Sequence, residues 1–171
     1  MTAFQIVALG VVFVAVVWDV SSRRIPNLLT FGSALAAIAA HAYFGGLTGL
    51  GFALLGWVVG VALFFPVFAL GGMGAGDIKL LGAIGAWLGA ASVIWVGLFS
   101  AIAGGVLAII VAAYSGYLMQ ALRNVWGLLL YWRVAGMRPQ PELTLMAGPN
   151  APRLAYAVPV LAGLMVTLWF R

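Results

Sequence analysis

Two long stretches of this sequence, residues 28–76 and 80–122, carry no formal charge. A helix needs roughly 20 apolar residues to cross a bilayer core of about 30 Å, so each stretch is too long for one crossing. Only 6% of the 171 residues are charged, against about a quarter in a typical soluble domain. The sequence therefore predicts an all-α, polytopic membrane protein, and it excludes a soluble enzyme or a disordered chain.

The composition also excludes several kinds of site. The net charge of +5 comes from scattered basic residues that form no patch, so we expect no nucleic-acid partner. Because there is no cysteine, disulfides, thiol chemistry and cysteine-based zinc sites are ruled out. One histidine and three acids leave little material for a metal site. We expect neither a metal nor a cofactor, and we expect the lipid bilayer as a partner.

Breaks in the apolar sequence predict about six transmembrane helices within a single domain, residues 1–171. The expected spans are residues 1–18, 28–44, 47–70, 78–90, 93–118 and 154–170. The first of these has no Lys or Arg ahead of it and no clear cleavage site, so we interpret it as a retained span. Residues 119–153 hold four arginines, four prolines and Glu142 and are expected to form a cytoplasmic or interfacial loop. Within this loop, Trp126, Tyr131 and Trp132 beside arginines suggest an interfacial helix.

The distribution of basic residues predicts the orientation. With the N-terminus outside, six spans place seven of the eight Lys and Arg residues on the cytoplasmic side, as the positive-inside rule requires. The seven are Arg23, Arg24, Lys79, Arg123, Arg133, Arg138 and Arg153, and only Arg171 remains outside. If the short span 78–90 failed to cross, the four loop arginines would move outside and violate the rule.

This topology places two of the three acids at one membrane depth. Asp19 ends the first span and Asp77 begins the fourth, both on the cytoplasmic side. An ionisable side chain within a membrane domain is costly, so each acid needs an explanation. Paired carboxyl groups can share a proton: one takes a proton from water while the other polarises a carbonyl. Asp19 and Asp77 could therefore act as a catalytic pair that needs no cofactor, whereas the plainer alternative is that each acid only caps or anchors a helix end.

Residues close to the two acids are candidates for supporting roles. Gly74 and Gly76 offer backbone conformations closed to other residues and allow close approach of a peptide. Lys79 could add positive potential beside the pair, although a lysine that snorkels to the interface is the favoured interpretation. Pro26 and Asn27 are expected to end the first connection and cap the next helix.

These segments resemble a known family. Gly74-Ala75-Gly76-Asp77, followed by Ile78-Lys79-Leu80-Leu81, resembles the GxGD motif of intramembrane-type aspartic peptidases. Asp19 followed by Arg23-Arg24-Ile25-Pro26-Asn27 resembles the first-aspartate segment of one branch, the prepilin peptidases. Tyr156-Ala157-Val158-Pro159 with Gly163 resembles the last span of that family more loosely.

Within the prepilin peptidases, the sequence is most similar to the short, CpaA/TadV-like form of tight-adherence (Flp-type) pilus systems. The long form adds a methyltransferase portion and a cysteine-bearing insert. The resemblance implies an aspartic endopeptidase of the bacterial inner membrane that removes a short basic leader, just after a glycine, at the cytoplasmic face. Its partners would be prepilins, with pseudopilin-like proteins as a further candidate class of substrate, and N-methylation is not assured. Asp19 and Asp77 are the catalytic residues that the motifs carry over.

Two other functions remain open from the residues alone. A small proton-coupled transporter could use Asp19 and Asp77 as relay groups, but both lie near one membrane face and no convincing inverted repeat is present. A structural assembly factor of a secretion complex would require no acids at all.

Overall fold

The computed structural model describes residues 1–70, 73–116, 118–136 and 155–170. Over these residues the chain forms helices and no strand, which confirms the all-α prediction. The helices are α1 (Ala3–Ser22), α2 (Asn27–Ala69), α3 (Ala75–Leu88), α4 (Ala90–Tyr114), α5 (Leu118–Ala135) and α7 (Ala157–Phe170).

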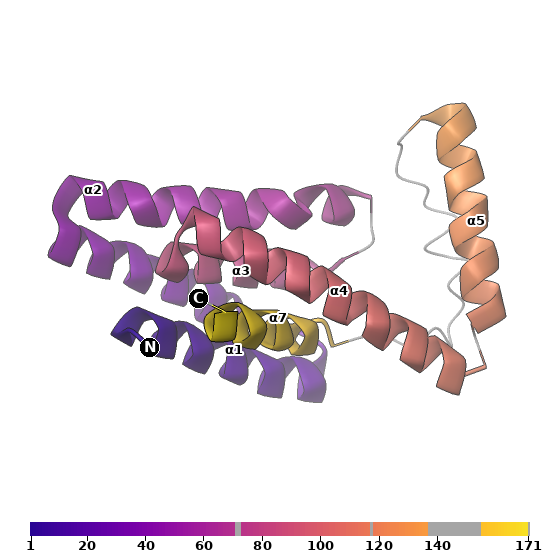
Figure 1. Ribbon diagram of the computed structural model, residues 1–171, viewed down its shortest axis with the longest axis horizontal. Helices are drawn as coiled ribbons and strands as arrows, with labels where there is room; N and C mark the ends of the chain where they lie inside the picture. The colour runs from indigo at the N-terminus through magenta and orange to yellow at the C-terminus, as the bar shows by residue number, and fades with distance from the viewer. Residues whose placement is uncertain (71–72, 117, 137–154, 171) are drawn as a thin grey trace.

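The 43 residues of α2 are two helices joined by a reversal at Gly46. This residue has φ 58° and ψ −144°, a conformation that glycine adopts without the steric cost of a side chain. The chain doubles back there, as the left-hand end of α2 in Figure 1 shows. The predicted division between residues 28–44 and 47–70 is therefore confirmed.

Most helices lie roughly along the long axis of the molecule: α1, both halves of α2, α3, α4 and α7 (Figure 1). In chain order, each of these runs in the direction opposite to the one before it. Among the described residues, α1, α2 and α4 are long and apolar enough to cross a membrane. The helices α3 and α7 have 14 residues each, or about 21 Å at 1.5 Å per residue. The alternating directions suit six spans, while the number of crossings and the outward N-terminus stay predictions.

Several predicted borders are wrong by a few residues. The fourth span was predicted to begin at residue 78, but α3 begins at Ala75, so Gly76 and Asp77 lie in its first turn. The predicted spans 78–90 and 93–118 are separated in the structure by Gly89 alone, whose φ of 79° lets α4 begin at the next residue. Asp19 lies in the last turn of α1, which continues to Ser22 instead of ending before this acid.

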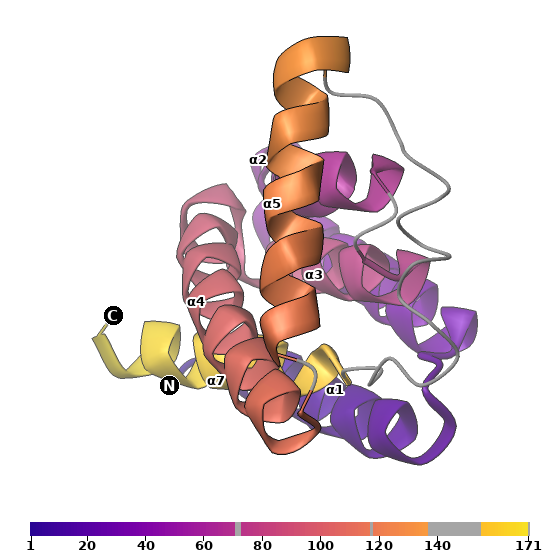
Figure 2. The same cartoon turned by 90° about the vertical axis from the view of Figure 1, so that its right-hand side faces the viewer.

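The expected loop 119–153 begins with a helix. Its first part belongs to α5, whose axis crosses those of the other helices at a steep angle in both views (Figures 1 and 2). Contacts of α5 with the other helices are mainly with the preceding α4. Trp126 is 65% exposed on this helix. The helix predicted around Trp126, Tyr131 and Trp132 is thus present, whereas Arg138, Glu142 and Arg153 lie outside the described residues.

The centre of the bundle is α3, and glycines bring it close to α2. Every residue of α3 from Leu80 to Trp87 is buried. Gly56 and Gly85 face each other so closely that a Cβ on either would collide with the carbonyl oxygen of the other. A Cβ on Gly60 would lie 3.0 Å from the Cα of Gly82. These glycines therefore allow close helix packing, and this backbone contact fixes α3, and with it Asp77, against α2.

Candidate active site

The last turn of α1 holds Asp19 in a buried position. Its side chain is 6% exposed, while its own carbonyl oxygen accepts the N–H of Arg23 at 2.9 Å. Arg23 closes the helix with a φ of 54°, the left-handed conformation common at helix C-termini. This cap ends α1 at Ser22, three residues after Asp19, so the buried carboxyl group lies at the end of the bundle and not halfway along it.

The first turn of α3 holds Asp77 through a capping interaction. Gly74 is the N-cap residue, and its backbone N–H donates to the Asp77 carboxylate three residues later. An acid at this third position satisfies one of the N–H groups that a helix leaves without a partner. A Cβ on Gly74 would lie 3.1 Å from Asp77 Oδ2, closer than side chains normally pack. Because Gly74 has no side chain, the Asp77 carboxylate can lie directly against the backbone of this N-cap residue.

The structure brings the two acids together from opposite ends of their helices. The end of α1 and the beginning of α3 lie at the same end of the bundle (Figure 1). Asp19 and Asp77 are close enough for the charge of the first to act on the second, and Asp77 acts in turn on the hydroxyl group of Tyr156. Two carboxyl groups in such range can divide the roles of proton donor and acceptor.

Gly76 permits close packing at this end of the bundle. A Cβ there would lie 3.3 Å from the Cβ of Ile25, in the connection between α1 and α2. Neither Gly76 nor Gly74 has a positive φ, and Gly74 has an ordinary φ of −75°. The expectation of unusual backbone conformations at these glycines is wrong, and the space that each one leaves explains its presence.

Lys79 contacts α2. Its Nζ donates to Asn27 Oδ1 at 2.9 Å and lies 5.0 Å from the centre of the Phe31 ring. These contacts attach the first turn of α3 to the first turn of α2, so they favour a positioning role for Lys79 over a charge aimed at the pair. Pro26 is the N-cap residue of α2 and Asn27 its first residue, so the expectation that they end the connection and begin this helix is confirmed, although no side chain makes a capping hydrogen bond.

The beginning of α7 completes the surroundings of Asp19. The backbone N–H of Ala157 donates to Asp19 Oδ2 at 3.1 Å, across 138 positions of sequence. Tyr156, the residue before the helix, packs edge-on against Phe64 and directs its hydroxyl group toward the Ser100 carbonyl oxygen at 3.4 Å. The sequence does not predict this hydrogen bond, because any residue other than proline has a backbone N–H and the donor therefore cannot be recognised from its residue type. Only the resemblance of residues 156–159 to a family segment indicated that this region belongs to the site.

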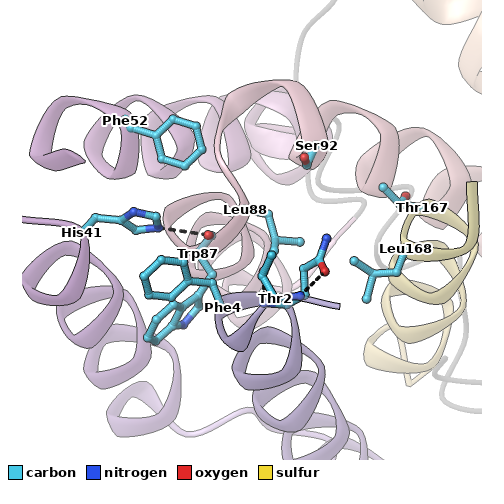
Figure 3. A pocket seen from close by; sticks show the side chains of 10 residues that line it. Thr2, Phe4, His41, Phe52, Trp87, Leu88, Ser92, Thr167 and Leu168 are labelled. Carbon is cyan, nitrogen blue, oxygen red and sulfur yellow. Dashed lines mark hydrogen bonds between the residues drawn. The ribbon is translucent and has the colours of Figure 1, made fainter. Parts of the chain in front are cut away.

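His41 lies at the opposite end of the bundle. It lines a cavity of about 190 Å³ together with Phe4, Phe52 and Trp87 (Figure 3). Its Nε2 lies 3.1 Å from the Trp87 carbonyl oxygen, and its ring lies 4.3 Å from that of Phe4. These contacts place His41 away from the acid pair. Among the residues that the structure describes, no group of His, Asp or Glu side chains is arranged to hold a metal ion.

The comparisons with known proteins give a family. Residues 6–109 match the model of the type IV leader peptidase family, a segment that includes both Asp19 and Asp77. No curated protein and no solved structure matches the sequence. Because the match covers more than half of the chain, and because the two acids of the matched segment meet at one end of the helical bundle, we conclude that the chain belongs to the type IV leader peptidase family.

Proposed function

We propose that this protein is an aspartic endopeptidase that removes the basic leader of Flp-type prepilins at the cytoplasmic face of the bacterial inner membrane, without N-methyltransferase activity. The observation that carries the proposal is the meeting of Asp19 and Asp77 at one end of the bundle, within the segment that matches the family. The absence of cysteine supports similarity to the short form of the family. The family match does not favour the transporter alternative.

The pair provides both proton transfers that amide hydrolysis needs. One carboxylate takes a proton from the attacking water, while the protonated partner donates a hydrogen bond to the scissile carbonyl oxygen. The resulting tetrahedral intermediate collapses when a carboxyl group gives a proton to the leaving nitrogen, which frees the new N-terminus. The N–H groups of Ala157 and Gly74 hold the two carboxyl groups in place during these transfers.

The proposal predicts cleavage by the protein alone in a bilayer. Purified protein in liposomes should convert a Flp-type prepilin into a product that begins after the leader glycine, as mass spectrometry of the new N-terminus can show. We expect a free, unmethylated amine on that product even when S-adenosylmethionine is present. A substrate with a bulky residue in place of the glycine is the control and should stay intact. If proton flux through the liposomes depends on both acids while no leader is removed, the transporter is correct instead.

The backbone donor at Ala157 allows a second prediction. In Ala157→Pro the N–H that binds Asp19 is removed, and the first position of a helix is where proline is tolerated best. A hydrogen bond to a charged group contributes about 1.5–3 kcal/mol, so we expect cleavage to slow by about 10- to 100-fold. Ala157→Gly keeps the N–H and is the matched control. Equal initial rates for the two variants, with equal thermal stability in detergent, would show that the N–H does not position Asp19.

A further inference from the structure

An apolar groove lies between α1 and the first half of α2. Its volume is about 520 Å³, and its walls include Val7, Val11 and Trp18 from α1 and Leu29, Gly32 and Ala36 from α2. On each helix these residues recur at three-, four- or seven-residue spacings, so each set forms one face. Although α1 and α2 are consecutive in sequence, α1 packs mainly on α3 and α7, which leaves the two helices apart along this groove.

The walls of this groove suit a hydrocarbon surface. Ser33 and Trp87, which also border it, use their polar atoms on each other: the Trp87 Nε1–H donates to Ser33 Oγ at 2.9 Å. Val7 and Trp18 remain 42% and 49% exposed. The groove therefore offers contact area to an apolar partner without leaving a buried polar group unsatisfied.

One end of the groove adjoins the candidate active site. Trp18 immediately precedes Asp19, and Pro26 from the next connection lies at the same end. From Trp18 the groove follows α1 back to Val7, a distance of roughly 16 Å for eleven residues of helix. A chain that leaves the acid pair along this groove is thus directed into the predicted membrane interior.

Gly32 deepens the groove on the α2 side. A Cβ at Gly32 would meet no atom within 4 Å, in contrast to Gly56 and Gly85, which pack against backbone. Glycine within a helix costs about 1 kcal/mol relative to alanine, and nothing inside the chain makes use of the space that Gly32 leaves. Small residues of this kind let a second helix backbone approach closely in a membrane.

We infer that this groove docks the apolar helix that follows the cleaved bond of the substrate and so presents that bond to Asp19 and Asp77. The inference rests on the proposed function. The continuity of the groove with the Asp19 end of α1 selects this occupant, because Trp18 and Pro26 line the groove on either side of the turn that holds Asp19. An apolar helix seated along Val7, Val11 and Trp18 would therefore begin at the end of the bundle where the acid pair lies. Lipid chains or a second copy of the protein are the alternatives that an experiment must exclude.

The experiment fills the groove and compares two substrates. One substrate is a prepilin with its apolar helix, and the other is a short soluble peptide that spans the same bond without it. We expect Gly32→Leu to lower kcat/KM for the full prepilin about 10-fold more than for the short peptide, mainly through KM. Gly105→Leu is the matched control, because Gly105 is an exposed helical glycine on α4 with equally open space, and it should process both substrates like the wild type.

Photo-cross-linking supplies an independent outcome. A photoreactive residue at Val11, in a protein inactivated by Asp77→Asn, should capture the uncut prepilin, whereas one at the exposed Ile109 of α4 should not. An equal loss on both substrates in Gly32→Leu, or capture at Val11 of only lipid or a second copy, would overturn the docking inference. If the wild type cleaves neither substrate, the proposed function itself fails, which is a distinct result.

Discussion

We expect that asparagine in place of either Asp19 or Asp77 abolishes leader removal. The amide has the shape of the carboxyl group and can still accept the N–H of Ala157 or Gly74, so the fold should survive either change. An amide can neither take a proton from water nor donate an acidic proton to the scissile carbonyl. In the proposed mechanism one acid performs the first step and the other performs the second, so the loss of either stops the reaction. General acid–base catalysis contributes about 10²- to 10⁴-fold, and we expect at least that loss from either variant.

Single-turnover cleavage of a Flp-type prepilin in liposomes measures this loss. Glu142→Gln makes the same acid-to-amide change at the third acid of the sequence and should leave the rate unchanged. The double variant should be no slower than either single one, because the pair acts as a unit. Leader removal at more than a tenth of the wild-type rate by Asp19→Asn or Asp77→Asn would contradict the aspartic mechanism.

Alanine in place of Gly56 or Gly85 separates α2 from α3. In each variant the new Cβ would overlap a backbone carbonyl of the opposite helix, and backbone cannot rotate aside as a flexible side chain can. Overpacking of this kind costs about 1–3 kcal/mol or more. We expect a lower unfolding midpoint in detergent, and we expect cleavage to fall with it because the displaced α3 carries Asp77.

Gly51→Ala is the matched control for the contact between α2 and α3. Gly51 lies on the same helix as Gly56, but a Cβ there would meet no atom within 4 Å. Alanine at this position should raise helix stability slightly, by up to about 1 kcal/mol. Thermal unfolding followed by tryptophan fluorescence compares the three variants, and equal midpoints for Gly51→Ala and Gly85→Ala would contradict the packing argument.

Most of the helical arrangement could be predicted from the sequence, because the few charged residues divide it clearly into apolar segments. The uncharged stretches of sequence predicted where the helices lie. The gap between the predicted spans 28–44 and 47–70, which holds Gly45 and Gly46, predicted the reversal within α2. The positions of Asp19 and Asp77 at the ends of predicted spans anticipated their placement at one end of the bundle. These features follow from hydropathy along the chain, a local property that a single sequence records directly.

Other features of the site depend on contacts that no local pattern encodes. Asn27 resembles a helix cap in sequence, yet its side chain accepts a hydrogen bond from Lys79, 52 positions away. The role of Gly74 depends on the nearby Asp77 carboxylate and not on its own φ, which is ordinary. Composition around each residue cannot reveal these partners, since they come together only when separate helices pack.

The hydrogen bond between Asp19 and the N–H of Ala157 has a consequence for the timing of activity during synthesis. The donor follows the acceptor by 138 residues, so at about 5–20 residues per second the ribosome adds it roughly 7–28 s later. Both acids leave the ribosome before the residue that fixes one of them in place. A nascent chain therefore lacks this contact to Asp19 until α7 has been made and has packed on α1.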